Sequence, residues 1–161
     1  MSYVIVRGSV PIFWEQKGMI EDVVLTKSSE LTAQAFQKHM RDLIATYSDI
    51  TVVDLLSDTK AREVVLTSEY VKQIYESPRD IKGKLKFVHY DFHGFCSGDR
   101  YQRLKVLIGK AQEGLSNYGF FLEDMDEKKV RRLQTGVFRV NCLDSLDRTN
   151  VAQSMLGLVV F

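Results

Sequence analysis

The chain has 161 residues, of which 45% are hydrophobic and 27% charged, a composition typical of one globular domain and not of a disordered segment. Its formal net charge of +1 argues against nucleic acid as the main partner, because domains that bind nucleic acid usually carry a clear basic excess. No apolar run approaches the roughly 20 residues needed to cross a bilayer, so the sequence predicts no membrane-spanning helix.

Segments typical of strands and of helices alternate along the chain. Short runs of β-branched and aromatic residues predict strands over residues 3–6, 50–56, 85–90 and 137–140. Apolar residues at helical spacing predict helices over 31–47, 66–75 and 104–115, and a last helix from Thr149 onward. We expect Ser29 to cap the first helix, Gly119 to end the third, and Pro11 and Pro78 to mark boundaries. The polar stretch 124–132 is expected to be a surface loop.

This order predicts an α/β fold with a mainly parallel central sheet flanked by helices. In such sheets ligands bind beyond the carboxyl ends of the strands. Cys142 directly follows the last predicted strand, and a predicted helix comes soon after it. Because Arg148 follows Cys142 after five residues, the sequence predicts a Cys-dependent phosphatase-like catalytic loop between this strand and this helix.

The stretch from Cys142 to Arg148 carries the clearest chemical signal, a cysteine followed after five residues by an arginine. The backbone between them can curl so that successive N–H groups point inward and form an anion-binding nest. That positive field favours the thiolate, which is the nucleophile, and the guanidinium can hold two phosphate oxygens. The expected phosphate ligands are Arg148 and the loop residues Leu143, Ser145 and Leu146. The competing interpretation of the cysteine is a small buried hydrophobic residue.

Two aspartates in the loop are candidates for the acid that protonates the leaving oxygen. This acid must carry a proton when the substrate binds, which the charge of a bound phosphate favours. Asp147, beside the arginine, is the better candidate and Asp144 the alternative, although either can instead cap a helix or pair with an arginine. Thr149 can bond the sulfur and help it leave, or act as a helix cap. Phosphoryl transfer to sulfur needs no metal and no cofactor, because the arginine and the nest carry the charge.

The letters RVNCLDSLDRTN of residues 139–150, with Gln153, resemble the signature of the Sac-domain phosphoinositide phosphatases, Arg-x-Asn-Cys-x-Asp-Cys-Leu-Asp-Arg-Thr-Asn-x-x-Gln. Ser145 stands where that family most often has a second cysteine. Residues 7–14, RGSVPIFW, resemble the family's Arg-Gly-Ser-x-Pro-x-Phe-Trp motif, and residues 89–93 resemble its Asp-Phe-His segment. The spacing of these blocks is similar to that of synaptojanin-type Sac domains.

The resemblance implies an enzyme that hydrolyses phosphate monoesters from the inositol headgroup of membrane phosphatidylinositol phosphates through a phosphocysteine. It also implies that residues 1–161 are a partial Sac domain, because the family has an N-terminal subdomain before the Arg-Gly-Ser motif and more helical chain after the loop. Asp91 and His93 are expected to brace the loop, and Arg7 is expected to make a structural pair more than to bind phosphate. The full set of supporting residues is Asn141, Asn150, Asp91, His93 and Arg7.

Other candidates are weaker. His89, Asp91 and His93 alternate, so on a strand they would share one face and form a possible metal trio, but such patterns are mostly incidental. Trp14 is expected to pack in the core. One basic cluster consists of Lys82, Lys84 and Lys86, and a second of Lys128, Lys129, Arg131 and Arg132. The second precedes the loop strand closely and is expected to adjoin the loop, so membrane contact and a simple solvated face both stay open for it.

The loop chemistry thus predicts a Cys-dependent phosphatase without nucleic-acid partners, and the resemblance implies phosphoinositides as its substrates. Its two cysteines are too few for a disulfide framework, so both are expected to be free in a cytoplasmic protein that sits peripherally at the cytosolic face of membranes. One alternative is a tyrosine or dual-specificity phosphatase, disfavoured because the loop lacks glycines and a histidine before Cys142. The other is a Sac fragment that is non-catalytic or folds incompletely.

Overall fold

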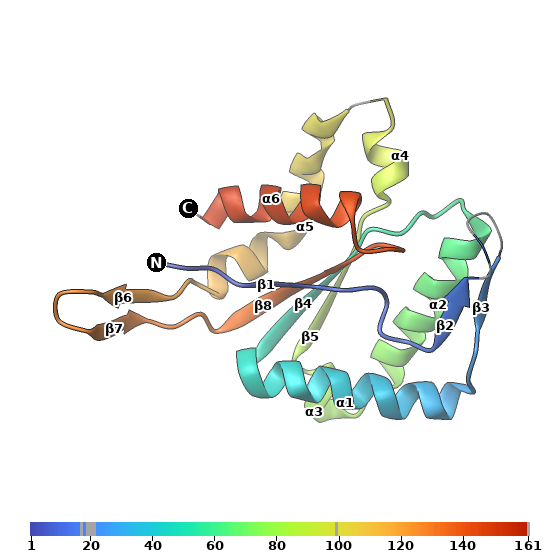
Figure 1. Cartoon of the computed structure of the whole chain (residues 1–161), viewed down its shortest axis with the longest axis horizontal. Helices are drawn as coiled ribbons and strands as arrows, with labels where there is room; N and C mark the ends of the chain where they lie inside the picture. The colour runs from blue at the N-terminus through green and yellow to red at the C-terminus, as the bar shows by residue number, and fades with distance from the viewer. Residues whose placement is uncertain (17, 19–21, 99, 161) are drawn as a thin grey trace.

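A four-stranded parallel sheet forms the centre of the molecule (Figure 1). The computed structural model describes residues 1–16, 18, 22–98 and 100–160. The strands lie in the order β1 (Ile5–Arg7), β8 (Gly136–Asn141), β4 (Asp49–Asp54) and β5 (Leu85–His89). Each neighbouring pair is parallel. The α/β class predicted from the sequence is confirmed.

The two central strands set the position of the loop. Every residue of β8 is buried, and so are the last five of β4, as expected for parallel strands covered on both faces. The register pairs Asp54, the last residue of β4, with Asn141, the last residue of β8. Both strands therefore end level with each other, and the chain after each of them emerges at the same edge of the sheet.

Helices cover both faces of this sheet (Figure 1). One face carries α1 (Ser29–Tyr47), α2 (Ala61–Glu76) and α3 (Arg79–Lys82), and the other carries α4 (Phe92–Cys96), a 3-10 helix η1 (Tyr101–Arg103), α5 (Leu104–Asn117) and α6 (Asp147–Val160). Successive strand residues divide between the two cores: Val52 packs in the first and Val53 in the second. Side chains of a strand alternate between faces, so each layer of helices has its own apolar core.

Two antiparallel hairpins complete the fold, β2 (Trp14–Gln16) with β3 (Val23–Leu25) and β6 (Leu122–Asp124) with β7 (Lys129–Arg132). The expectation of a surface loop over 124–132 is wrong for its ends, which are strands. The cause is that β7 is exposed over its whole length, so backbone pairing holds it without the apolar pattern that reveals a strand. Trp14, in β2, packs half-buried against the first core, as predicted.

Helix boundaries follow the capping residues. Ser28 caps α1, its hydroxyl accepting from the Leu31 amide at 3.4 Å, whereas Ser29 is already helical; the prediction was off by one residue. Gly119 follows α5 in the left-handed region with φ of 63°, as expected for a helix stop. His89, Asp91 and His93 do not share a face of one strand, because β5 ends at His89 and Asp91 caps α4 by accepting from the Gly94 amide at 2.9 Å.

Candidate active site

Cys142 lies at the carboxyl end of β8, fully buried and free. Its Sγ accepts a hydrogen bond from Thr149 Oγ1 at 3.2 Å and donates one to Asp144 Oδ1 at 3.3 Å. Thr149 is also fully buried and belongs to the first turn of α6. The sulfur is thus held between a hydroxyl donor and a carboxylate acceptor, at the strand end where the sequence placed it.

The loop turns through a left-handed residue before α6 begins. Ser145 has φ of 57°, a region that costs a residue with a side chain about 1–2 kcal/mol. Asp144 Oδ1 also accepts from the Leu146 amide at 3.0 Å, which holds the turn closed. Backbone outside the favoured regions clusters at functional sites, because the surrounding structure must enforce it.

Arg148 is fixed by a buried carboxylate that the sequence reading missed. Its Nη1 donates to Glu63 Oε2 at 2.7 Å and more weakly to the Leu55 carbonyl at 3.4 Å. The same Glu63 oxygen accepts from the Ser57 amide at 2.8 Å, and only 1% of the Glu63 side chain is exposed. Glu63 lies on the apolar stripe of α2, and a carboxylate at such a position is the signal that could have identified it.

Arg7, at the end of edge strand β1, clamps the loop to α6. Its Nη2 donates to the carbonyl of Ser145 and its Nη1 to Asn150 Oδ1, with a weaker bond to Gln153 Oε1 at 3.4 Å. These contacts join residues more than 130 positions apart in the chain. Arg7 and Asn150 thus have a structural role in holding the loop.

Beneath the loop lies a buried polar network. Asn141 Nδ2 donates to Asp54 Oδ1 at 2.5 Å, and Asn141 Oδ1 accepts from Arg139 Nη1 at 3.3 Å. Arg139 also donates to the Ser9 carbonyl at 2.6 Å. The hydrogen bond to Asp54 and nearby carboxylate charge raise the pKa of His89. Satisfied networks of this kind make a strand end rigid.

Next to the loop is an open hollow of about 400 Å³. Its lining comes from the loop, from the start of α2, from α4, and from the end of β2 and the chain after it: Leu143, Asp144, Arg148, Lys60, Arg62, Glu63, His93, Gln16 and Gly18. His93 Nε2 is 2.8 Å from Lys60 Nζ. Burial and the charges of Lys60 and Arg148 lower the pKa of His93, which favours the neutral ring, and a neutral ring nitrogen can accept from the lysine ammonium. Asp91 is bonded instead to its own helix and to the Asp58 amide at 3.3 Å.

The two candidate acids occupy different positions. Both are exposed residues, but Asp144 lines the hollow and touches the sulfur, whereas Asp147 opens α6 and is not among the lining residues. Burial raises the pKa of Asp144, but the Leu146 amide, the Cys142 thiol and the charge of Arg148 outweigh it and leave the pKa below its ordinary value. Of the two, Asp144 has the geometry of a group that can exchange a proton with the sulfur.

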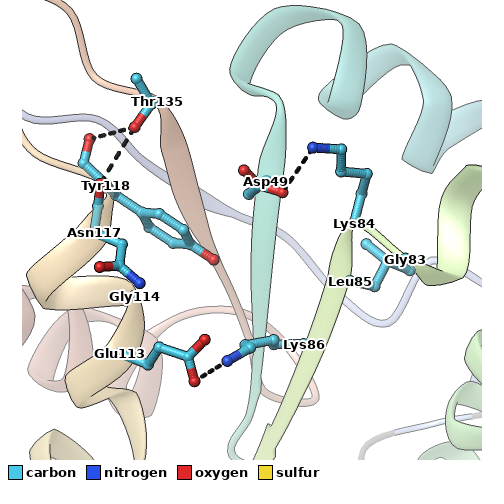
Figure 2. A pocket seen from close by; sticks show the side chains of 10 residues that line it. All are labelled: Asp49, Gly83, Lys84, Leu85, Lys86, Glu113, Gly114, Asn117, Tyr118 and Thr135. Atoms are coloured by element: carbon cyan, nitrogen blue, oxygen red, sulfur yellow. Dashed lines mark hydrogen bonds and ion pairs between the residues drawn. The ribbon is translucent and has the colours of Figure 1, made fainter.

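Both basic clusters lie away from this edge of the sheet. Lys84 and Lys86 line a second hollow at the amino ends of the strands, where they pair with Asp49 and Glu113 (Figure 2). The hairpin that carries Lys128, Lys129, Arg131 and Arg132 projects beyond the amino end of β8, while Cys142 follows its carboxyl end (Figure 1). The expectation that this cluster adjoins the loop is wrong, because the whole strand separates them. Arg131 is also paired with Asp124 at 3.0 Å and Glu127 at 2.6 Å.

Within the part of the chain that the structure describes, neither a metal-binding cluster nor a membrane-spanning helix is found. In residues 1–16, 18, 22–98 and 100–160, no group of three or more histidine, cysteine, aspartate and glutamate side chains is arranged to hold a metal ion. Among the helices of the same described residues, none has the length and apolar character needed to span a bilayer.

The fold places this chain among the α/β proteins with a parallel sheet, and its cysteine loop lies at the carboxyl end of a central strand. Comparison with known proteins is more specific: a family model described as the SacI homology domain matches residues 1–97. Because that match covers more than half of the 161 residues, the chain belongs to the SacI homology domain family. The cysteine loop itself lies outside the matched residues.

Named relatives align along nearly the whole chain. Polyphosphatidylinositol phosphatase INP53 of Saccharomyces cerevisiae is 36% identical over 159 residues, covering 97% of this chain and 14% of that protein. Synaptojanin-1 of Mus musculus is 36% identical over 160 residues, covering 98% and 10%. Phosphoinositide phosphatase SAC8 of Arabidopsis thaliana is 36% identical over 157 residues, covering 94% and 25%. The chain thus spans between a tenth and a quarter of the length of these relatives.

Proposed function

We propose that this chain is the catalytic part of a phosphoinositide phosphatase and that residues 1–161 form part of a Sac phosphatase domain. The observation that carries the proposal is the loop geometry: a buried Cys142 sulfur between Thr149 Oγ1 and Asp144 Oδ1, with Arg148 lining the same hollow as Asp144. Two relatives named as phosphatases of phosphoinositides, INP53 and SAC8, support the substrate class.

In the first step the Cys142 thiolate attacks phosphorus, forming the S–P bond as the P–O bond to inositol breaks. The proton that leaves the thiol has an acceptor within reach, Asp144 Oδ1 at 3.3 Å. Asp144 then gives this proton to the inositol oxygen, which departs with the electron pair of the broken bond. One proton therefore passes from sulfur to carboxylate to leaving group, and Asp144 needs no other source for it.

Arg148 and the loop amides stabilise the charge on the phosphoryl oxygens during this step. In the second step water attacks phosphorus, Asp144 takes a proton from it, and the sulfur leaves with the S–P electron pair. The Thr149 hydroxyl, 3.2 Å from the sulfur, stabilises the thiolate as it forms. Asp144 thus holds a proton for the leaving oxygen in the first step and takes one from water in the second. For this its pKa must rise when a phosphate dianion occupies the loop, and the repulsion between the two negative charges raises it.

Contact with the membrane that carries the lipid remains a prediction for the basic hairpin. Reversing the charges of Lys128, Lys129, Arg131 and Arg132 should weaken binding to anionic liposomes, and unchanged binding would remove this role. The structure now argues less for it, since the hairpin and the loop lie at opposite ends of β8.

The proposal is tested by phosphate release from a panel of short-chain phosphoinositides, with Cys142→Ser beside the wild type and a chelator present. Release by the wild type alone is expected, because the thiolate is the nucleophile. Release by both proteins would exclude a thiolate mechanism. If neither releases phosphate although both melt cooperatively, the chain is a folded but inactive part of a longer protein.

A further inference from the structure

The part of the hollow's lining that comes from the start of α2, here called the α2 wall, carries two cations that the proposed chemistry does not use. Lys60 directly precedes α2 and Arg62 is the second residue of that helix. Both line the hollow together with Arg148 and Asp144. Lys60 is about two-fifths exposed and Arg62 is half-buried, so both are open to a ligand.

The charges of the hollow are unequally distributed. Among the described lining residues, the cations are Lys60, Arg62 and Arg148 and the carboxylates are Glu63 and Asp144, which leaves one positive charge in excess. Both carboxylates are engaged on the loop side, Glu63 by Arg148 at 2.7 Å and Asp144 by the thiol and a backbone amide. Lys60 Nζ lies 4.0 Å from Glu63 Oε1, the outer limit of an ion pair, and Glu63 is shared with Arg148. One positive charge among the described lining residues is therefore left to balance another anion.

A hydrogen bond to His93 holds the Lys60 ammonium and leaves donors for an anionic ligand. Its Nζ lies 2.8 Å from His93 Nε2, and this neutral ring uses one of the three lysine donors. The other two donors remain for a ligand, and Arg62 lines the same hollow. Arginine and lysine together are well suited to a phosphate, the first as a planar fork and the second as a point charge.

We propose that Lys60 and Arg62, with His93 holding the lysine, form a second phosphate subsite, so that this chain recognises a headgroup by two phosphates and not only by the one it removes. The inference rests on the proposed function and specifies its substrate. Two sources supply the same chemistry: a second monoester on the inositol ring, or the diester that links the ring to glycerol. A hollow of about 400 Å³ is within the range of small-molecule sites.

The test is calorimetric binding to the full chain in the Cys142→Ser background, where turnover is blocked. Three soluble probes separate the sources: an inositol monophosphate, its glycerophosphoinositol counterpart with the added diester, and an inositol bisphosphate. The subsite variant is Lys60→Ala/Arg62→Ala. The matched control, Lys38→Ala/Lys105→Ala, removes the same charge from exposed residues of α1 and α5 that do not line the hollow.

The subsite variant should bind at least one two-phosphate probe about tenfold or more weakly, because each charge-assisted hydrogen bond is worth about a factor of ten. The monophosphate should change by less than about twofold, as should every probe with the control. A selective loss on the glycerophosphoinositol probe assigns the subsite to the diester, and a selective loss on the bisphosphate assigns it to a ring monoester. Equal losses on all probes, no loss, or no binding of any probe overturn the subsite.

Phosphate release by the protein with Cys142 intact separates the two proposals. If the binding pattern holds but no phosphoinositide is hydrolysed, the subsite stands and the phosphatase function fails. If hydrolysis proceeds while the binding losses are equal on all probes, the function stands and the subsite fails.

Discussion

Replacing Glu63 by alanine should destabilise the fold strongly. The carboxylate has 1% of its side chain exposed and accepts from Arg148 at 2.7 Å and from the Ser57 amide at 2.8 Å, and 13% of the Arg148 side chain is exposed. Glu63→Ala therefore leaves a largely buried guanidinium and a buried amide without their acceptor. Removing one partner of a buried ion pair typically costs about 3–5 kcal/mol. Each kcal/mol lowers Tm by about 2–4 °C for a chain of this length, so a fall of about 6–20 °C is expected.

The assay is thermal unfolding followed by circular dichroism. Glu76→Ala is the matched control, because Glu76 is an exposed glutamate at the end of the same helix, and it should change Tm by less than about 2 °C. The double variant Glu63→Ala/Arg148→Ala should be less destabilised than the two single losses combined, since the unpaired charge is then gone. A Tm within about 3 °C of wild type for Glu63→Ala, or strictly additive losses in the double variant, would refute the buried pair.

Three further outcomes follow from the structure. Gly136→Ala should cost about 1–3 kcal/mol in urea unfolding, because a Cβ there would overlap the ring of Tyr118; an unchanged midpoint would contradict this packing. The hydrogen bond to Asp54 raises the pKa of His89, so the stability that the charged ring contributes is complete below about pH 6.5 and is lost as the pH rises through the folded-state pKa. The loss of Tm caused by His89→Gln should therefore be smaller at pH 8.5 than at pH 5.5, and an equal loss at both would contradict this ion pair. Thr149→Val should lower phosphate release about tenfold or more and move its acidic limb to higher pH, because the sulfur loses its hydroxyl donor; an unshifted profile would show that the bond is only structural.

The central strands and the long helices could be predicted because their local sequences show the apolar patterns of buried elements. The strands β4 and β8 are runs of β-branched and apolar residues covered on both faces, and α1, α2 and α5 carry apolar stripes at helical spacing. Once strands and helices alternate, a parallel sheet follows, and with it the edge at which Cys142 lies. The position of the loop was therefore available from the sequence.

Elements without a buried face could not be predicted in the same way. The strand β7 is exposed at every position, so only its pairing with β6 defines it. The strands β2 and β3 do contact the first core, but with three residues each they are too short to show an apolar pattern. The basic cluster was expected near the loop because Arg132 is only ten positions from Cys142. In the structure the six-residue strand β8 lies between them and separates the hairpin from the loop.

The partners of the loop are another part that local reasoning misses. Glu63 precedes Arg148 by 85 positions and Arg7 precedes Asn150 by 143, so neither pair is visible in a local pattern. The choice between Asp144 and Asp147 was equally beyond the sequence, because both lie in the loop and only its turn at Ser145 decides which one reaches the sulfur. Tertiary structure, and not residue type, selects these contacts.

The central claim is that Cys142 is the nucleophile of a phosphoryl transfer, and rapid acid quenching followed by mass spectrometry tests it most directly. The account predicts that, during turnover of a short-chain phosphoinositide, a phosphoryl group is found on Cys142 and on no other residue. It also predicts that Asp144→Asn makes less of this adduct, because the leaving oxygen then lacks its proton. Steady release of phosphate with no adduct on Cys142 at any quench time would contradict the account.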